Sequence, residues 1–118
     1  MNTFKKGKIG EESAEKYLIE RGYTPVARNF KAHPGEIDII MTSGCDLVFV
    51  EVKAWKNMPV MELERSIDAR KQHRIMAASQ VFMLQNQRLC QGKTIRYDVI
   101  FVDGGGEITH IKDAFGDY

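Results

Sequence analysis

Two runs of sequence decide the fold, Glu36-Ile37-Asp38-Ile39-Ile40-Met41 and Leu47-Val48-Phe49-Val50-Glu51-Val52-Lys53-Ala54. Both runs are rich in β-branched residues, and the turn-forming residues 43–46 separate them, so they predict a β-hairpin. Side chains alternate between the two faces of a strand, which places Glu51 and Lys53 on one face of the second strand. In the first strand the same alternation groups Glu36, Asp38 and Ile40, opposed by Ile37, Ile39 and Met41.

The register of this hairpin decides whether its acidic residues meet. A four-residue loop pairs Thr42 with Leu47 and sets Asp38 directly opposite Glu51, whereas a loop one residue longer turns Asp38 to the other face. Two opposed carboxylates repel each other unless a cation lies between them. We therefore expect the first register, with Asp38 and Glu51 as the ligands of a divalent metal ion.

This arrangement of residues suits phosphodiester hydrolysis. Carboxylate oxygens bind Mg²⁺, with Mn²⁺ as an alternative, and Mg²⁺ keeps several waters and takes few protein ligands. Such an ion offsets the charge that builds on phosphoryl oxygens, and the ammonium group of Lys53 would stabilise the same transition state. The competing interpretation is a surface ion pair, because Glu-x-Lys on a strand most often forms one that contributes little to stability.

The remaining elements are predicted from apolar periodicity and from breaker residues. A helix is expected over residues 8–21, with Ala14, Tyr17 and Leu18 on its apolar stripe, followed by a strand over residues 24–30 and a loop over residues 31–35. A long helix is expected between residues 62 and 87, and two further strands over residues 95–102 and 108–111. The order α-β-β-β-α-β-β predicts an α/β fold in which helices flank a mixed β-sheet.

The long helix is predicted to carry basic residues close to the acidic hairpin. Its buried stripe is expected to contain Ile67, Lys71, Ile75, Ala78, Phe82 and Gln85. Lys71 therefore stands where an apolar residue is expected, and with Lys53 and Arg74 it is a candidate contact for nucleic acid. A solvated face of mixed charge explains the same residues equally well.

Bulk composition sets the outer limits on function. The chain has 118 residues, which fits one domain over residues 1–118, and a formal net charge of +1, which is low for a dedicated nucleic-acid coat protein. No apolar run is long enough to cross a bilayer, so no membrane role is expected. Cys45 and Cys90 are isolated from each other and from histidines, which argues against zinc and against a disulfide framework. We expect a cytoplasmic protein.

The same residues carry a resemblance to a known family. Gly10-Glu11, Arg28-Asn29-Phe30, Gly35-Glu36-Ile37-Asp38, Phe49-Val50-Glu51-Val52-Lys53, Lys71-x-x-Arg74-Ile75 and Arg96-Tyr97-Asp98 resemble motifs of the bacterial YraN family, uncharacterised protein family 0102. That family is similar to archaeal Holliday-junction resolvases within the PD-(D/E)XK nuclease superfamily. The resemblance covers essentially the whole chain and implies a restriction-endonuclease-like fold.

The resemblance also implies a role for each matching residue. Asp38 and Glu51 match the metal ligands, Lys53 matches the catalytic lysine, and Glu11 matches a helix glutamate of the resolvases. One departure from the family pattern is Trp55, which stands near the position where an arginine often follows Glu-x-Lys. A structural role for Trp55 is the favoured interpretation, and stacking on an unpaired base is the alternative.

Three functions from different classes follow from these observations. The first is a Mg²⁺-dependent DNA endonuclease, acting as a homodimer on branched DNA. The second is a DNA- or RNA-binding protein with a weak or inactive nuclease site, and the third is a scaffold that uses the fold to bind a protein partner. The complete set Asp38, Glu51 and Lys53 favours the first function over the second.

Overall fold

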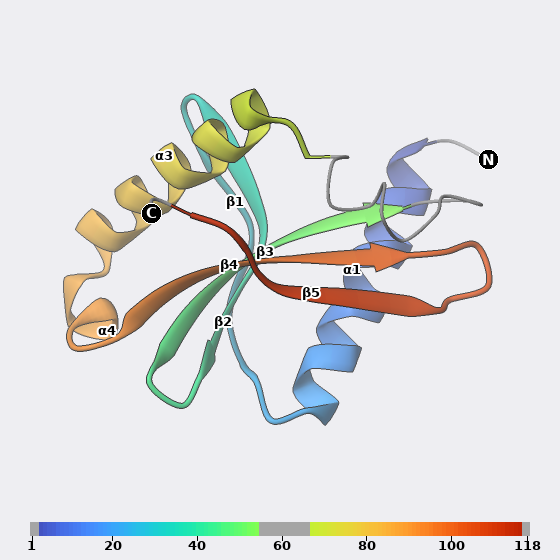
Figure 1. Cartoon of the computed structure of the whole chain (residues 1–118), viewed down its shortest axis with the longest axis horizontal. Coiled ribbons are helices and arrows are strands. Elements are labelled where there is room, and N and C mark those ends of the chain that lie inside the picture. The colour runs from blue at the N-terminus through green and yellow to red at the C-terminus, as the bar shows by residue number, and fades with distance from the viewer. Residues whose placement is uncertain (1–2, 55–66, 117–118) are drawn as a thin grey trace.

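The computed structural model describes residues 3–54 and 67–116, which form a five-stranded β-sheet with a helix on each side (Figure 1). The sheet order β1-β2-β3-β4-β5 follows the chain, with β3 and β4 parallel and the other neighbours antiparallel. The elements are α1 (Thr3–Glu20), β1 (Thr24–Ala32), β2 (Gly35–Ser43), β3 (Asp46–Ala54), α3 (Ala69–Gln85), α4 (Gln87–Cys90), β4 (Thr94–Val102) and β5 (Ile108–Phe115). The predicted α/β fold with a mixed sheet is confirmed, and the short helix α4 was not predicted.

The two faces of the sheet are covered by different helices. On one face, Ala14 and Leu18 of α1 pack on Val48, Val50 and other residues of the central strands. On the other face, Ile75, Ala78 and Phe82 of α3 pack on the sheet, with Ile40, Leu47, Phe49 and Tyr97 among their neighbours. Five consecutive residues of β3, from Leu47 to Glu51, are buried, as expected for a strand that has neighbours on both edges and helices on both faces.

The helices begin and end where local chemistry allows. Helix α1 ends two residues before Gly22, whose φ of 90° permits the turn in which the Tyr23 N–H bonds back to the Leu18 carbonyl. Helix α3 begins after Asp68, whose carboxylate accepts the Lys71 N–H at 2.9 Å. The long helix was predicted to begin near residue 62. Residues 67–68 are not helical, so that part of the prediction is wrong, and residues 62–66 lie outside the described part of the chain.

Three of the sequence predictions need correction, two in the strands and one in α3. The β1–β2 ladder continues to Ala32–Gly35, so the predicted loop at residues 31–35 shrinks to the turn formed by His33 and Pro34. Ile37 packs with Ile40 on the α3 side of the sheet, which breaks the predicted alternation of β2. The β1 partner region contains Asn29 with a left-handed φ of 53°, and this conformation rotates the strand pair locally. Gln85 of α3, predicted to be buried, is exposed because the helix ends there.

The tip of the β1–β2 hairpin lies directly against the backbone of α3. A Cβ atom added at Gly35 would come within 2.4 Å of the Arg74 carbonyl oxygen, a distance that no real Cβ contact adopts. A glycine is therefore required for this close approach. The contact fixes the distance between the hairpin and the helix, and hence the width of the space between them.

We predict that Gly35→Ala destabilises the protein, because either the hairpin tip or α3 must move away to accommodate the methyl group. The expected loss is about 1–3 kcal/mol in the free energy of unfolding, as for other overpacked positions. Chemical denaturation monitored by circular dichroism measures it. Gly104→Ala is the matched control, since a Cβ there meets nothing within 4 Å, and equal stability of the two variants would refute the close approach.

Candidate functional site

Strands β2 and β3 separate at the position of the predicted acidic pair. Thr42 pairs with Leu47 as predicted, but the ladder ends at Ile39–Val50, one step before Asp38 and Glu51 would pair. Beyond that step the Val52 N–H donates to the Asp38 carboxylate at 2.8 Å instead of bonding to the β2 backbone. The expectation of a direct cross-strand ladder pair is therefore corrected. Where β2 and β3 separate, the Asp38 side chain takes the place of a β2 backbone carbonyl as the acceptor for Val52.

The two carboxyl groups still meet, through their side chains. Glu51 is hydrogen-bonded to Asp38, and its side chain is only 7% exposed. Burial, the hydrogen bond that protonated Glu51 donates to Asp38, and the negative charges of Asp38 and Glu36 raise the pKa of Glu51 to about 9. A carboxyl group in this setting holds a proton at neutral pH, because a buried carboxyl group beside a second carboxylate ionises only at a high cost without a compensating cation.

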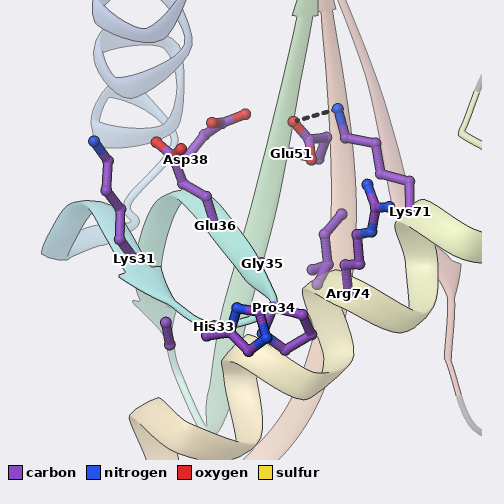
Figure 2. Close-up of a pocket in the computed structure, with 11 residues that line it drawn as sticks. Lys31, His33, Pro34, Gly35, Glu36, Asp38, Glu51, Lys71 and Arg74 are labelled. Carbon is purple, nitrogen blue, oxygen red and sulfur yellow. Dashed lines mark ion pairs between the residues drawn. The ribbon is translucent and has the colours of Figure 1, made fainter.

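Lys71 reaches the pair from α3 without neutralising it. Its Nζ lies 3.7 Å from Glu51 Oε1, a distance within the range of an ion pair (Figure 2). This contact lowers the pKa of Glu51, yet burial and Asp38 together outweigh it. The Lys71 side chain is 51% exposed, so solvent screens its charge and the contact is weak. We therefore expect Glu51 to hold a proton in the absence of metal, with Lys71 nearby as an exposed cation.

The acidic pair opens into a cavity of about 580 Å³ between the β1–β2 hairpin and α3 (Figure 2). Two of the predicted nucleic-acid contacts, Lys71 and Arg74, line this cavity together with Asp38 and Glu51. Lys53 is not among the described residues that line it. Lys53 is half-buried on β3, beside Phe101 of β4, on the same face of the strand as Glu51. The structure thus brings together four of the predicted site residues and leaves Lys53 one step along the strand.

Glu11 approaches the pair from the α1 side of the sheet. Its carboxylate lies 3.6 Å from the guanidinium of Arg28. Burial and the negative charge of Asp38 raise the pKa of Glu11, although the contacts with Asn29 and Arg28 lower it. The charge on Asp38 therefore affects the pKa of Glu11, but Glu11 is not among the residues that line the cavity. Its predicted catalytic role stays a prediction.

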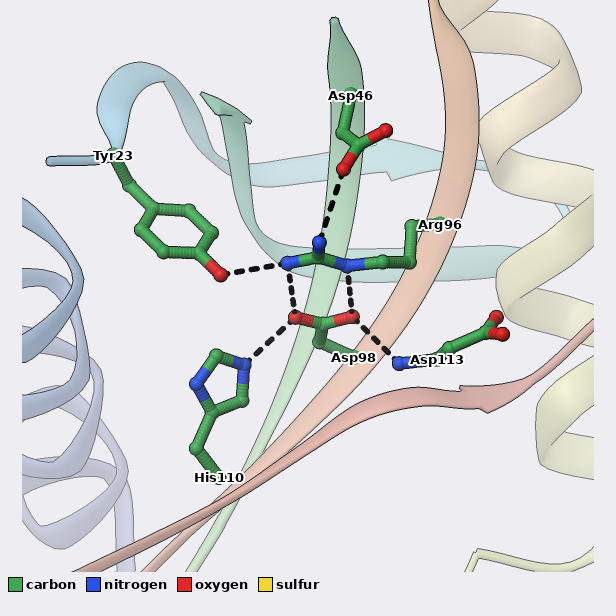
Figure 3. Close-up of polar contacts among 6 residues, drawn as sticks. All are labelled: Tyr23, Asp46, Arg96, Asp98, His110 and Asp113. Atoms are coloured by element: carbon green, nitrogen blue, oxygen red, sulfur yellow. Dashed lines mark hydrogen bonds and ion pairs between the residues drawn. The ribbon is translucent and has the colours of Figure 1, made fainter. Parts of the chain in front are cut away.

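A second buried polar cluster, centred on Asp98 of β4, has a different character (Figure 3). Asp98 is fully buried and accepts two hydrogen bonds of 2.9 Å from Arg96, one of 3.0 Å from the Asp113 N–H, and a 2.7 Å contact with His110. Burial alone would raise the pKa of Asp98, but the contacts with His110 and Arg96 hold it below its ordinary value. With every lone pair directed at a donor, this carboxylate is a structural anchor.

Two cationic or polar residues of the cavity were not selected from the sequence. Lys31 and His33 line it from the β1–β2 hairpin tip, where the sequence predicts an unstructured loop. Their positions follow from the extension of the ladder to Ala32–Gly35. Gly35 is the residue from which Lys31 and His33 could have been predicted as site residues, because a glycine in a strand indicates the close approach of another backbone.

The donor set of the acidic pair fits a hard divalent cation. Asp38 and Glu51 offer carboxylate oxygens, which Mg²⁺ and Mn²⁺ prefer, and a cation in place of the shared proton would offset both the burial of Glu51 and the negative charge of Asp38. Within residues 3–54 and 67–116, no group of three or more histidine, cysteine, aspartate or glutamate side chains is close enough to hold a metal ion. The proposed metal site therefore has two carboxylate ligands. Two protein ligands suit Mg²⁺, because a bound Mg²⁺ ion keeps several of its water ligands.

Comparison with known proteins assigns the chain to a family of similar length. The family model described as "Uncharacterised protein family UPF0102" matches residues 10–102. A UPF0102 protein of Persephonella marina is 38% identical over 115 residues, covering 98% of this chain and 97% of the relative. A UPF0102 protein of Legionella pneumophila strain Philadelphia 1 is 40% identical, covering 96% of each chain. A third, from Lachnoclostridium phytofermentans, is 40% identical over all of this chain and 98% of the relative.

We predict that stability in a chelating buffer falls as the pH rises from about 5 to about 9, and that Glu51 causes part of the fall. With a pKa raised to about 9, folded Glu51 keeps a proton that the unfolded chain releases above its ordinary pKa. This contribution to stability is complete at low pH and is lost as the pH rises through that window. Thermal melts should therefore show a weaker pH dependence for Glu51→Gln, which is always neutral.

The size of the effect and its control follow from the same linkage. At pH 8 Glu51→Gln should be more stable than the unmodified chain by about 1 kcal/mol or more, since one pKa unit corresponds to about 1.4 kcal/mol. Glu12→Gln, which changes an exposed glutamate of α1, should reproduce the unmodified pH profile. Parallel pH profiles for all three proteins would show that Glu51 is ionised in the folded state.

Proposed function

We propose that this chain, which belongs to uncharacterised protein family UPF0102, is a metal-dependent endonuclease that hydrolyses phosphodiester bonds in DNA. The observation that carries the proposal is the pair of half-buried Asp38 and buried Glu51 at the mouth of a cavity that Lys71 and Arg74 also line. Carboxylates held close together at a cost to their ionisation indicate a site arranged for a cation. Cations beside them on the same cavity wall indicate a substrate that carries negative charge, as a phosphodiester does.

Each group has a distinct role in this proposal. Asp38 and Glu51 would hold one Mg²⁺ or Mn²⁺, and the ion, when bound, would offset negative charge on the reacting phosphate. The Val52 N–H orients the Asp38 carboxylate through its 2.8 Å hydrogen bond and leaves the second oxygen for the cation. Lys71 and Arg74 would bind the phosphates of the substrate strand, because both line the cavity from one face of α3.

Lys53 is proposed to stabilise charge at the reacting phosphate. It follows Glu51 on the same face of β3, and hydrolysis requires a cation near the phosphoryl oxygens as water forms a new P–O bond and the ester P–O bond breaks. Lys53 does not line the cavity among the residues described. A long, flexible side chain two residues from a metal ligand can reach the reacting phosphate by a change of rotamer, which is the movement the proposal requires.

The position of Lys53 also favours a second candidate function. A nucleic-acid-binding protein with a weak or inactive site needs Lys71 and Arg74 but has no use for Lys53 or for a metal ion. The two functions differ in one respect that is simple to measure. A nuclease cleaves DNA in the presence of Mg²⁺, whereas a binding protein retains DNA without cleaving it.

We predict that the purified protein cleaves DNA in Mg²⁺ or Mn²⁺ and not in a chelator, across a panel of linear, flapped and four-way substrates. Asp38→Asn, Glu51→Gln and Lys53→Met should each lower the cleavage rate about a hundredfold or more, the size expected when a group that stabilises transition-state charge is removed. Lys112→Met, at an exposed position of β5, is the control for Lys53. Cleavage that persists in Asp38→Asn would place the activity elsewhere.

We also predict that Mg²⁺ or Mn²⁺ raises the melting temperature, because a ligand that binds only the folded state stabilises it. The cation removes the repulsion between Asp38 and Glu51, so the rise should be larger at pH 8 than at pH 5, where protons compete with the metal. A chelator should abolish it. An equal rise in the Asp38→Asn, Glu51→Gln double variant would show that the cation acts at another site.

A further inference from the structure

The cavity beside the acidic pair has cations on two opposite walls. Lys31 extends from the β1–β2 hairpin, Lys71 and Arg74 extend from α3, and the carboxylates of Asp38 and Glu51 lie between them (Figure 2). A polyanionic chain lying in such a space would have phosphates within reach of cations on both sides. The walls come from segments far apart in the sequence, so only the folded chain produces this arrangement.

One end of the cavity is closed. Gly35 lies against the Arg74 carbonyl so closely that a single methyl group would not fit between them, and His33 and Pro34 fill the same end (Figure 2). A nucleic-acid strand that enters the cavity beside Asp38 and Glu51 therefore cannot continue past the hairpin tip. A continuous double helix needs a trough that is open at both ends, and this cavity does not provide one.

The closed end differs chemically from the acidic mouth. Pro34 and the imidazole ring of His33 line this end, and Ala32 and Ile75 add apolar surface to the cavity (Figure 2). Apolar groups and a flat imidazole ring suit the face of a nucleic-acid base, which stacks on such side chains. With a volume of about 580 Å³ the cavity falls within the range of sites for a single small molecule.

We propose that this cavity receives one unpaired nucleotide, so that the substrate is a single strand or a single-stranded flap and not an intact duplex. The base lies against His33 and Pro34 at the closed end, and its phosphates lie between Lys31 on the hairpin and the α3 cations. The scissile phosphodiester then lies over Asp38 and Glu51. The inference rests on the proposed nuclease function for the position of the cut, but the preference for unpaired strands is a property of binding alone.

An unpaired strand also avoids an energetic cost that a duplex must meet. Placing a paired base in the cavity requires that it leave the helix, and unstacking and unpairing a base are unfavourable. A flap or a free strand has already lost that pairing. The cavity should therefore discriminate between the two substrates without reading any base sequence.

Binding to fluorescent DNA by the Glu51→Gln protein tests this inference, because the variant keeps the cavity and should not cleave. Three probes are compared at the same low salt: a single strand, a duplex with a single-stranded flap, and a fully paired duplex. Fluorescence anisotropy should show about tenfold tighter binding of the first two probes than of the duplex. Equal affinity for the flap and the duplex would overturn the inference.

Variants of the hairpin tip test whether the cavity causes the preference for flapped DNA over duplex DNA. His33→Ala should weaken flap binding about tenfold, as when a stacking partner is removed, and leave duplex binding unchanged. Lys31→Ala should weaken flap binding and reduce its dependence on salt concentration. Arg88→Ala, an exposed cation of α4, is the control and should change neither. Circular dichroism melts establish that each variant is folded, and a flap preference that survives both hairpin substitutions would refute the assignment.

The outcome separates this inference from the nuclease proposal. A protein that prefers flaps in binding but cleaves nothing in Mg²⁺ would support the unpaired-strand cavity and refute the nuclease. A protein that cleaves intact duplex as fast as flapped DNA would support the nuclease and refute the cavity assignment.

Discussion

The structure depends on a carboxylate that is completely withdrawn from water. Asp98 is bonded to Arg96 on its own strand, to the backbone of β5 and to His110, and Arg96 in turn reaches Tyr23 and Asp46. The network thus joins the start of β1, the start of β3, and strands β4 and β5. Asp98 is the parallel partner of Val50, so the network fixes the strand immediately before Glu51. A buried charge is tolerated only when its hydrogen-bonding capacity is filled, and here every contact that fills it also fixes an element of the sheet.

Comparison of Asp98 with Glu51 shows how one fold holds two buried acids with opposite properties. Both lie on central strands, and both are removed from solvent. Asp98 is surrounded by donors, which hold its pKa below the ordinary value in spite of burial, whereas burial and the neighbouring acid Asp38 both raise the pKa of Glu51. The difference lies in the partners and not in the depth of burial. A protein gains no stability from placing two carboxyl groups together, so the arrangement calls for a functional explanation, and the metal site that we propose supplies one.

Local patterns in the sequence were sufficient for most of the fold. The runs around Ile39 and Val50 predict the central hairpin, and Thr42–Leu47 gives its register, because alternation and turn length are local properties. The reversal of faces between Ile37 and Ile40 could not be predicted in this way, since strict alternation assumes a regular strand, and here the left-handed Asn29 of β1 lies beside the point of reversal. Asp38 and Glu51 meet as anticipated, although through side chains. Lys31 and His33 were missed because their place in the cavity depends on contact with α3, which is remote in sequence.

The sequential order of the sheet has a consequence for how the chain is made. Strands β1, β2 and β3 follow one another through short turns, so their contacts are local and form early, whereas α3 and β4 must complete a crossover. During synthesis the N-terminal part emerges first, so the segment that carries Asp38 and Glu51 leaves the ribosome before the segment that carries Lys71 and Arg74. A chain interrupted at that stage carries the acidic pair without the cations of α3. Such a fragment has Lys31 and His33 of the hairpin tip but lacks one whole wall of the cavity, so the cavity exists only once α3 has packed against the hairpin.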